Sequence, residues 1–594
     1  MLSNIASRAA GPAQAIVRRD SVEIVNQVTA AEALVQCLIR EGVDTAFGIA
    51  SGYLSVFLDA LRRGGIKAIV NLHEGASGFA AAGYTLASGK IGILYTQSGP
   101  GVVNAVTPVA AAYMDSVPMM LIATQAPLGL YGRDAHQEVS GGVHGIEQLD
   151  MFRSAATVRY RPTTGDTLIR STRRAIAASY GRRAPSVVEV AGDLWGRKVE
   201  HEDLAPEEYR AISSPIDVAG LAKVIELLRD AKRPALLVGH RAVHRGTSAE
   251  LIAFCEKQDL PVATVDFAKG AIPEDHPLSL GLLGSCGHDS AATYLQSSDL
   301  VIALGTRMST QTTFDFDNSF FTNLVHIDEI AEEPGRNLKL KLGVISDLPG
   351  AIRALSASSV EPTQRGSVDA VRALHAEHHV YQLPVDRPAT STPAVLSAIR
   401  DVMPRETLVT GDSGLTLQYL KHFFPVYSAD GFFSLYSFAA MGSGLPVAIG
   451  VSLARPDVPT LCVIGDGGAL VHLSELAVAA FYKLRLVVVV INNNGYKQVG
   501  DRMEYYQHEA YGCALPPVDF AAVAAACGCD AYVATDAESA TAAVKKALEL
   551  KRPSVIEVRV QGDNLFDITP PQIKKWWDSI LDKTADPAHW PFEK

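Results

Sequence analysis

The sequence lacks the long apolar run, the basic block and the cysteine framework that mark several large classes of protein. No apolar stretch reaches the length of about 20 residues that a membrane-spanning helix needs. The net charge of −11, without any basic cluster, argues against a nucleic-acid-binding surface. The seven cysteines are scattered with no zinc or disulfide spacing, which favours a reducing compartment. We therefore expect a soluble protein of the cytoplasm.

The first 26 residues differ in composition from the rest of the chain. They contain Arg8, Arg18 and Arg19, with small residues between them and no acidic residue before Asp20. This composition faintly resembles a mitochondrial transit peptide, but the stretch has no clear amphipathic face. We expect a cytoplasmic tail, with mitochondrial import as the weaker alternative.

The remainder of the 594-residue chain has the composition of an ordinary globular protein, with 48% apolar and 20% charged residues. Such a length exceeds what one hydrophobic core can organise and indicates several domains. Short apolar runs alternate with helical patterns, which predicts doubly wound α/β domains with parallel sheets. The pattern breaks at two polar stretches, and the predicted divisions are tail 1–26, domains 27–200, 216–360 and 385–565, and tail 566–594.

Uninterrupted apolar runs predict the buried strands of these sheets, because parallel strands are covered on both faces. Thr29 precedes the first helical pattern as a candidate N-cap. The predicted strands are 45–49, 66–72, 91–96, 118–124, 233–239, 261–266, 299–305, 324–329, 461–464, 486–491 and 554–560.

Polar residues and glycines follow two neighbouring runs in the third domain. The first run ends in Gly-Asp-Gly-Gly and the second in three asparagines and a glycine. Glycines let backbone N–H groups approach a phosphate, and carboxylate, amide and carbonyl oxygens suit Mg²⁺ beside it. A simple glycine turn is the alternative for the first motif alone. The candidate residues are Gly465, Asp466, Gly467, Gly468, Asn493 and Gly495.

The spacing of these two motifs resembles the cofactor motif of thiamine-diphosphate enzymes, since Asp466 and Asn493 lie 27 positions apart. The chain resembles the group of acetolactate synthase, pyruvate oxidase and benzoylformate decarboxylase, and especially acetolactate synthase and sulfoacetaldehyde acetyltransferase. The resemblance implies pyrimidine-binding, middle and diphosphate-binding domains, with thiamine diphosphate and Mg²⁺ as cofactors. It also implies active sites between the first domain of one chain and the third of another, hence a homodimer or homotetramer.

Motifs in the first domain match the same group. NLHEGASGFAAAGY (71–84) resembles its H-E-x-x-A-x-x-x-A-x-G-Y pattern, which implies that the Glu74 carboxyl activates the cofactor's pyrimidine. An acidic residue that only favours a helix N-terminus is the structural alternative. The turn Ser-Gly-Pro-Gly (98–101) matches another motif, and Gly99 and Gly101 are expected to bring backbone close to the cofactor.

A third-domain stretch, FAAMGSGLPVAIG (438–450), also matches the group. The resemblance implies that Met441 wedges between the two rings of the cofactor. Backbone groups of Ala439 and Met441 would then bind its pyrimidine edge. Gly414, in the motif Gly-Asp-Ser-Gly, is a weaker candidate for contact with the diphosphate.

Residues that face the substrate should distinguish the reactions of this group. Gln97 stands where benzoylformate decarboxylases carry a proton-shuttling histidine, which argues against a simple decarboxylase of that type. Arg307 stands where acetolactate synthases place an arginine, although their usual R-F-D-D-R motif is absent. Each candidate could equally be structural. The catalytic candidates are His73, Gln97 and Gln137 beside Glu74, and the substrate candidates are Tyr53, Gln125, His136, His144 and Arg307.

The resemblance implies an acetolactate synthase-like enzyme that decarboxylates or cleaves a 2-oxo compound and transfers the acyl anion to an acceptor. An FAD-containing oxidase and a simple 2-oxoacid decarboxylase are the alternatives. A non-catalytic paralogue is disfavoured because Glu74, Asp466 and Asn493 are all present. FAD is possible but unsupported, because no flavin signature is found. Asp328, at a predicted strand end, is only weak support for a nucleotide.

Overall fold

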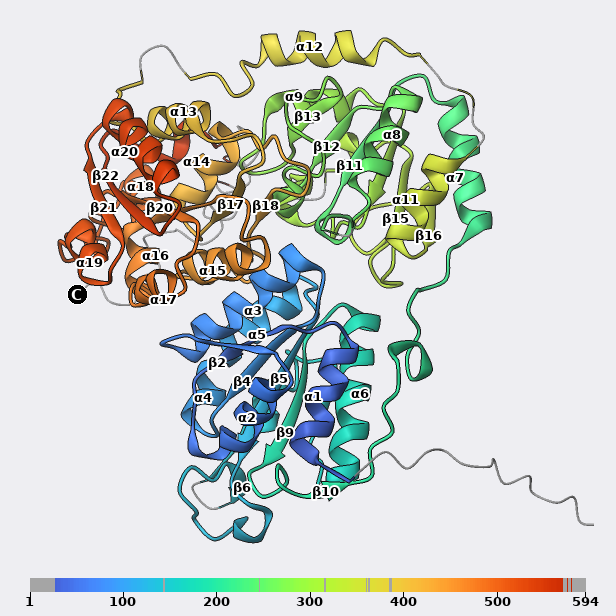
Figure 1. The fold of residues 1–594 in the computed structure, drawn as a ribbon. Coiled ribbons are helices and arrows are strands. Elements are labelled where there is room, and N and C mark those ends of the chain that lie inside the picture. The colour runs from blue at the N-terminus through green and yellow to red at the C-terminus, as the bar shows by residue number, and fades with distance from the viewer. Residues whose placement is uncertain are drawn as a thin grey trace, which may run out of the picture.

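The computed structural model describes residues 27–142, 145–244, 246–314, 317–358, 361, 364–383, 387–569, 574 and 578. Within this part the chain forms three α/β domains, each built on a six-stranded parallel sheet (Figure 1). This architecture confirms the predicted fold class. The predicted N-terminal tail, His144 and most of the predicted C-terminal tail lie outside the described residues.

The first sheet has the strand order β3-β2-β4-β5-β9-β8. Its first helix begins at a capping box, in which Thr29 Oγ1 accepts the Glu32 N–H at 3.2 Å and the Glu32 carboxylate accepts the Thr29 N–H at 2.7 Å. The strands are β2 (Thr45–Gly48), β3 (Lys67–Val70), β4 (Gly92–Thr96), β5 (Met119–Gln125), β8 (Arg159–Tyr160) and β9 (Ser186–Ala191). The helices are α1 (Ala30–Arg40), α2 (Ser55–Arg63), α3 (Glu74–Ser88), α4 (Pro100–Asn104), α5 (Val106–Met114) and α6 (Gly165–Arg182).

The middle sheet has the order β13-β12-β11-β14-β15-β16. Its strands are β11 (Pro234–Val238), β12 (Val262–Thr264), β13 (Ser279–Leu282), β14 (Leu300–Leu304), β15 (Leu324–Asp328) and β16 (Leu342–Ile345). The main helices are α7 (Val218–Asp230), α8 (Ser248–Gln258), α9 (Asp289–Gln296), α11 (Leu348–Ala357) and α12 (Ser367–Glu377).

The third sheet has the order β18-β17-β19-β20-β22-β21, so the two strands that end in the glycine and asparagine motifs are neighbours. Its strands are β17 (Leu408–Gly411), β18 (Phe432–Phe433), β19 (Thr460–Gly465), β20 (Leu486–Asn492), β21 (Asp530–Ala534) and β22 (Ser554–Arg559). The helices are α13 (Thr392–Val402), α14 (Leu415–Phe423), α15 (Gly444–Ala454), α16 (Asp466–Val471), α17 (Glu475–Phe481), α18 (Lys497–Tyr505), α19 (Phe520–Ala526) and α20 (Ala537–Leu550).

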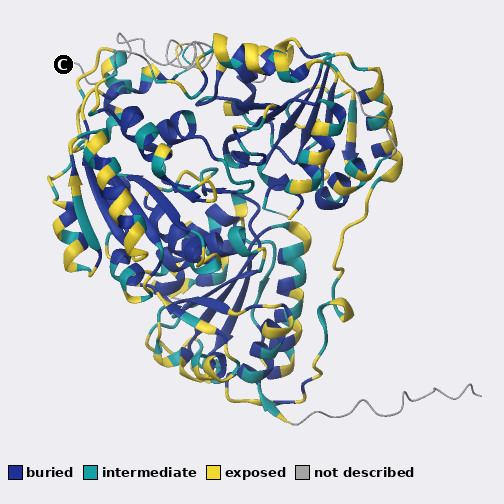
Figure 2. Ribbon diagram, turned by 45° about the horizontal axis from the view of Figure 1, so that its top comes forward, coloured by how far each residue is buried: buried dark blue, intermediate teal, exposed yellow. Residues whose placement is uncertain are grey.

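The sheets form the cores of the domains, and exposed residues lie on the outer helices and on the connecting loops (Figure 2). Each predicted apolar run coincides with an observed strand. Strands such as β13 and β16, which the sequence did not single out, are short and carry glycine. No helix in the described part of the chain has the length and apolar character needed to cross a membrane.

Helices α3 and α15 join the first domain to the third (Figure 1). They pack backbone against backbone at two glycines. A Cβ on Gly83 would lie 2.4 Å from the Val447 carbonyl oxygen, and one on Gly450 would lie 2.0 Å from the Ala80 carbonyl oxygen. Any larger residue at either position would therefore force the two helices apart.

Candidate active site

A cavity of about 300 Å³ lies at the carboxyl ends of β17, β19 and β20. This edge is where open α/β sheets bind their ligands. The residues that line the cavity all belong to the third domain. They include every candidate that the motifs indicated there except Ala439, namely Gly414, Met441, Gly465, Asp466, Gly467, Gly468, Asn493 and Gly495.

Asp466 is fixed in this cavity by the backbone of both motifs. One carboxylate oxygen accepts the Gly467 N–H at 2.7 Å, and the other accepts the N–H groups of Asn493 and Gly495 at 3.1 and 3.0 Å. Burial raises the pKa of Asp466, while these hydrogen bonds act in the opposite direction. The carboxylate therefore occupies a defined position between the two strand ends.

The donor set around Asp466 fits a hard divalent cation. Among the described residues, the buried Oδ1 of Asn493 has no hydrogen-bond partner, and a metal ion would satisfy it. The Gly495 carbonyl accepts only the Lys497 N–H at 2.9 Å among the described residues, which leaves one lone pair. Carboxylate, amide and carbonyl oxygens are the ligands that Mg²⁺ prefers beside a phosphate group.

The glycines of the first motif serve the packing of the protein itself. A Cβ on Gly467 would lie 2.6 Å from the Tyr496 ring, and one on Gly468 would lie 2.1 Å from Asp412 Oδ2. Gly414 differs, because its φ of +130° needs glycine and nothing lies within 4 Å of its added Cβ. Gly414 thus exposes its backbone to the cavity, as a phosphate contact requires.

Asp412 organises the turn that presents Met441, a role that the sequence motifs did not reveal. Its carboxylate accepts the Gly442 N–H at 2.8 Å and the Ser443 hydroxyl at 3.3 Å. Burial raises the pKa of Asp412 to about 6. The same turn holds Ala439 at a φ of +53°, a strained conformation for alanine, and leaves Met441 43% exposed at the cavity.

The remaining cofactor candidates gather at the carboxyl edge of the first sheet. Glu74 is the first residue of α3, and its carboxylate accepts the Asn104 side-chain N–H at 3.0 Å. A Cβ on Gly101 would lie 3.1 Å from Glu74 Oε1 and 3.4 Å from Gln97 Cβ. A Cβ on Gly99 would lie 3.9 Å from that of Gln137. Glu74, Gln97, Gly99, Gly101 and Gln137 therefore form one cluster.

Two residues of the third domain hold the loop that leads to Glu74, and neither was indicated by a motif. The buried Glu475 carboxylate accepts the Asn71 side-chain N–H at 2.8 Å and the Leu72 N–H at 2.9 Å. The His73 ring lies 5.4 Å from the His472 ring. His73 itself caps α3, because its Nδ1 accepts the Gly75 N–H at 3.0 Å. This loop is thus fixed against the third domain of its own chain.

Family profiles match all three domains. The thiamine pyrophosphate enzyme profiles cover the N-terminal TPP-binding domain at residues 28–145, the central domain at 221–355 and the C-terminal TPP-binding domain at 412–558. The chain belongs to the thiamine pyrophosphate enzyme family. Thiamine pyrophosphate is thiamine diphosphate, so the predicted family is confirmed.

The similarity of this thiamine pyrophosphate enzyme to curated proteins extends over nearly its whole length. The acetolactate synthase large subunit of Parasynechococcus marenigrum is 32% identical over 567 residues, covering 92% of this chain and 90% of that protein. A probable acetolactate synthase large subunit of Methanococcus aeolicus is 29% identical over 575 residues, covering 92% and 94%. One of Methanocaldococcus jannaschii is 28% identical over 565 residues, covering 91% and 93%.

The substrate candidates of this thiamine pyrophosphate enzyme are dispersed within one chain. Gln125 is fully buried, and its Oε1 accepts the Ala126 N–H at 2.8 Å and the Val139 N–H at 3.2 Å. Tyr53 packs over Gly192, whose added Cβ would lie 3.0 Å from the tyrosine ring. Both lie at the ligand-binding edge of the first sheet, whereas His136 is exposed to solvent.

Arg307 lines a different cavity, of about 270 Å³, between the middle domain and its neighbours. Burial lowers the pKa of Arg307, and the charge of Asp115 raises it. Within one chain, therefore, Arg307 does not share a cavity with Met441 or Asp466. The role of Arg307 as a substrate contact stays a prediction.

Asp328, the residue that weakly indicated a nucleotide at the middle sheet, is already paired within the protein. Asp328, at the end of β15, accepts hydrogen bonds from Arg241 Nε at 3.1 Å and from Nη2, and both side chains are fully buried. A Cβ on Gly239, after β11, would lie 2.3 Å from the Gly305 carbonyl oxygen after β14. Asp328 is therefore not available to a nucleotide, whereas the cavity that Arg307 lines opens after β11, β12 and β14 at this same edge of the sheet.

Proposed function

We propose that this enzyme uses thiamine diphosphate and Mg²⁺ to decarboxylate or cleave a 2-oxo compound and to transfer the acyl anion to an acceptor, as an acetolactate synthase does. The observation that carries the proposal is the presence of two complementary half-sites. The diphosphate half-site contains Asp466, Asn493 and Met441, and the pyrimidine half-site contains Glu74 and Gln97.

The diphosphate half-site would hold the charged end of the cofactor. Asp466, Asn493 and the Gly495 carbonyl would bind Mg²⁺, which neutralises the diphosphate. Met441, being half-exposed at the cavity, would support the bend between the two rings. When bound, thiamine diphosphate supplies a carbanion that adds to a carbonyl group, and the cofactor then accepts the electrons of the broken carbon–carbon bond.

The pyrimidine half-site would control protons. Glu74 would exchange a proton with the aminopyrimidine ring, and its hydrogen bond from Asn104 would keep the carboxyl group oriented. Glu475 and His472 would act as positioning residues, since they hold the 71–74 loop rather than the ring itself. Gln97 and Gln137, near Gly99 and Gly101, would face the reacting atoms.

Each active site would combine the half-sites of two copies, so the enzyme would be a homodimer or a homotetramer. In support, residues of the first domain do not line the diphosphate cavity of the described chain. Exposed apolar side chains border both half-sites, as expected of surfaces that meet in an oligomer. Leu72 and Val103 are 54% and 43% exposed beside the pyrimidine half-site, and Phe438 and Val471 are 44% and 49% exposed beside the diphosphate half-site.

Carboligation is favoured over simple decarboxylation because the pyrimidine half-site offers the amides of Gln97 and Gln137 near Glu74. A primary amide orients a carbonyl but does not shuttle a proton at neutral pH, so protonation to an aldehyde is not assisted. The alternative of an FAD-containing oxidase gains no support from Asp328, because Arg241 already pairs with that carboxylate.

The test is turnover of pyruvate with Mg²⁺ and thiamine diphosphate, following CO₂ and organic products together. Acetolactate or another coupled product would support the proposal, and the Glu74→Gln variant should then lose activity while still binding Mg²⁺. Acetaldehyde alone would identify a decarboxylase instead. Release of no CO₂ despite cofactor binding would indicate a different donor, such as a diketone, a sulfonated aldehyde or an acyl-CoA.

A further inference from the structure

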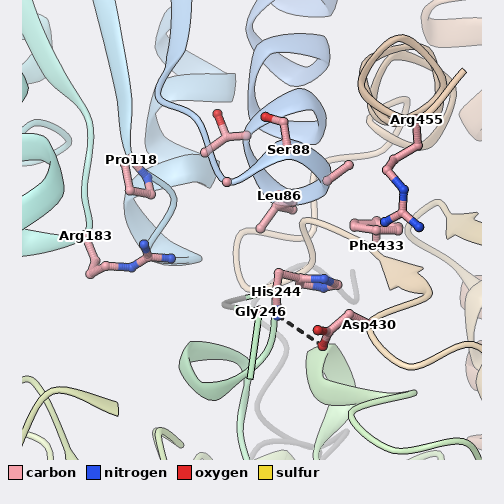
Figure 3. Close-up of a pocket in the computed structure, with 12 residues that line it drawn as sticks. Leu86, Ser88, Pro118, Arg183, His244, Gly246, Asp430, Phe433 and Arg455 are labelled. Carbon is pink, nitrogen blue, oxygen red and sulfur yellow. Dashed lines mark hydrogen bonds between the residues drawn. The ribbon is translucent and has the colours of Figure 1, made fainter. Parts of the chain in front are cut away.

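A third cavity, of about 480 Å³, lies where the three domains meet, and it is separate from both half-sites. The first domain contributes Thr85–Gly89 at the end of α3, together with Pro118 and Arg183. The middle domain contributes His244 and Gly246, and the third contributes Asp430, Phe433 and Arg455 (Figure 3). Its volume lies within the usual range of small-molecule sites.

Two arginines enter this cavity from different domains. In Figure 3 Arg183 and Arg455 lie on opposite sides of it, with Leu86 and Ser88 between them. The Arg183 Nε lies 3.7 Å from a Glu329 carboxylate oxygen. Arg455, by contrast, is exposed and has no ion-pair partner among the described residues. One guanidinium is thus left available for an anion.

The single acid of the lining does not neutralise these arginines directly. The Asp430 carboxylate accepts hydrogen bonds from the backbone N–H of His244 at 3.1 Å, drawn dashed in Figure 3, and from the Ser248 hydroxyl. Burial lowers the pKa of His244, so its ring is neutral at pH 7. The lining therefore carries the charge of Arg455 and that of Arg183, which Glu329 partly offsets, against one carboxylate that is already hydrogen-bonded to the protein.

The cavity is also preorganised and offers acceptors as well as donors. The His244 ring stacks on Phe433 with ring centres 4.5 Å apart, which ties the middle domain to the third. Helices α3 and α15 both end at the lining of the cavity. The last carbonyl groups of a helix have no hydrogen-bond partner inside that helix. These carbonyls would accept hydrogen bonds from hydroxyl or acid protons of a ligand.

The geometry points to a binding site for a small oxyanion, such as a phosphate or a dicarboxylate, that bridges the three domains. Its charged oxygens would contact Arg455 and Arg183, and its remaining protons would face the helix ends. The ligand would hold the domains together, and its binding should therefore raise the Tm of the protein.

The test uses the full-length protein saturated with thiamine diphosphate and Mg²⁺, so that the diphosphate half-site is filled. Inorganic phosphate and malonate are titrated separately at constant ionic strength, and the Tm is measured. We expect a saturable rise in Tm with at least one of these anions. The Arg455→Gln variant should weaken this binding by about tenfold or more, and Ser88→Glu should abolish it by adding a negative charge.

Arg372→Gln is the matched control, because Arg372 is 74% exposed on α12 and pairs only with Asp369 among the described residues. This variant should bind the anion as tightly as the wild type does. Equal affinity in the Arg455→Gln and Arg372→Gln variants would overturn the assignment. A Tm rise that sodium chloride reproduces, or no rise with either anion, would overturn it as well.

Discussion

Mixing two variants that are each inactive at a Mg²⁺ concentration too low to saturate Asp466→Asn should restore activity if each active site joins two copies of the chain. Glu74→Gln removes the acid of the pyrimidine half-site, and Asp466→Asn removes the proposed anionic metal ligand of the diphosphate half-site. Each variant alone has a defect in every site. In a mixed dimer one site combines both defects, whereas the other combines an intact Glu74 with an intact Asp466.

The expected activity follows from random pairing. An equal mixture gives half mixed dimers, each with one intact site of two, so the specific activity should reach about one quarter of the wild-type value. The two variants are co-expressed with different tags, and turnover of the 2-oxo substrate is compared with that of each variant alone. Co-expression of Glu74→Gln with a Glu74→Gln/Asp466→Asn double variant is the control and should give no activity. A mixture no more active than its components would refute the intermolecular site.

Three further predictions concern the metal, the helix pair and a buried acid. Asp466→Asn removes the anionic ligand and should raise the Mg²⁺ concentration for half-saturation by about 100-fold, measured by the Mg²⁺ dependence of cofactor binding; an unchanged requirement would exclude this metal site. Gly450→Ala should destabilise the protein by about 1–3 kcal/mol, because its Cβ would lie 2.0 Å from the Ala80 carbonyl oxygen. Gly181→Ala, with open space around it, should not lower the Tm in the same assay. Burial raises the pKa of Asp115 to about 6, so its ionisation above that pH opposes folding. Asp115→Asn should therefore raise the Tm at pH 8, and the gain should shrink as the pH falls through 6 towards 4; a loss of Tm at pH 8 would contradict this reasoning.

Features of the fold and the site that lie within one short stretch of the chain could be predicted from the sequence. The runs that became β19 and β20 are uninterrupted because parallel strands are buried on both faces. Asp466 and Asn493 follow these strands directly, so their meeting at one sheet edge followed from the topology. Gly467 and Gly468, which were predicted as part of a phosphate cradle, also leave room for Tyr496 and Asp412, and the sequence carries no signal for these two contacts.

The parts that depend on distant pairing could not be predicted. Asp412 holds the Met441 turn from 30 positions away, and Glu475 holds Asn71 from 404 positions away. A single sequence gives no signal for either contact, because burial and the partner decide the role of an acid. For the same reason, the sequence offered Asp328 as weak support for a nucleotide, although its carboxylate forms a buried ion pair with Arg241 in the structure.

The helix pair α3 and α15 provides a mechanical link across the molecule. Helix α3 begins at Glu74 and its 15 residues extend for about 22 Å, to the cavity between the three domains. Helix α15 starts just after the Met441 turn and ends beside Arg455. Because the two helix backbones are in direct contact at Gly83 and Gly450, we expect a shift of one helix to move the other and, with them, both half-sites. An anion in the distant cavity and the cofactor would then change each other's affinity by the same factor, which makes the pair a route for allosteric control.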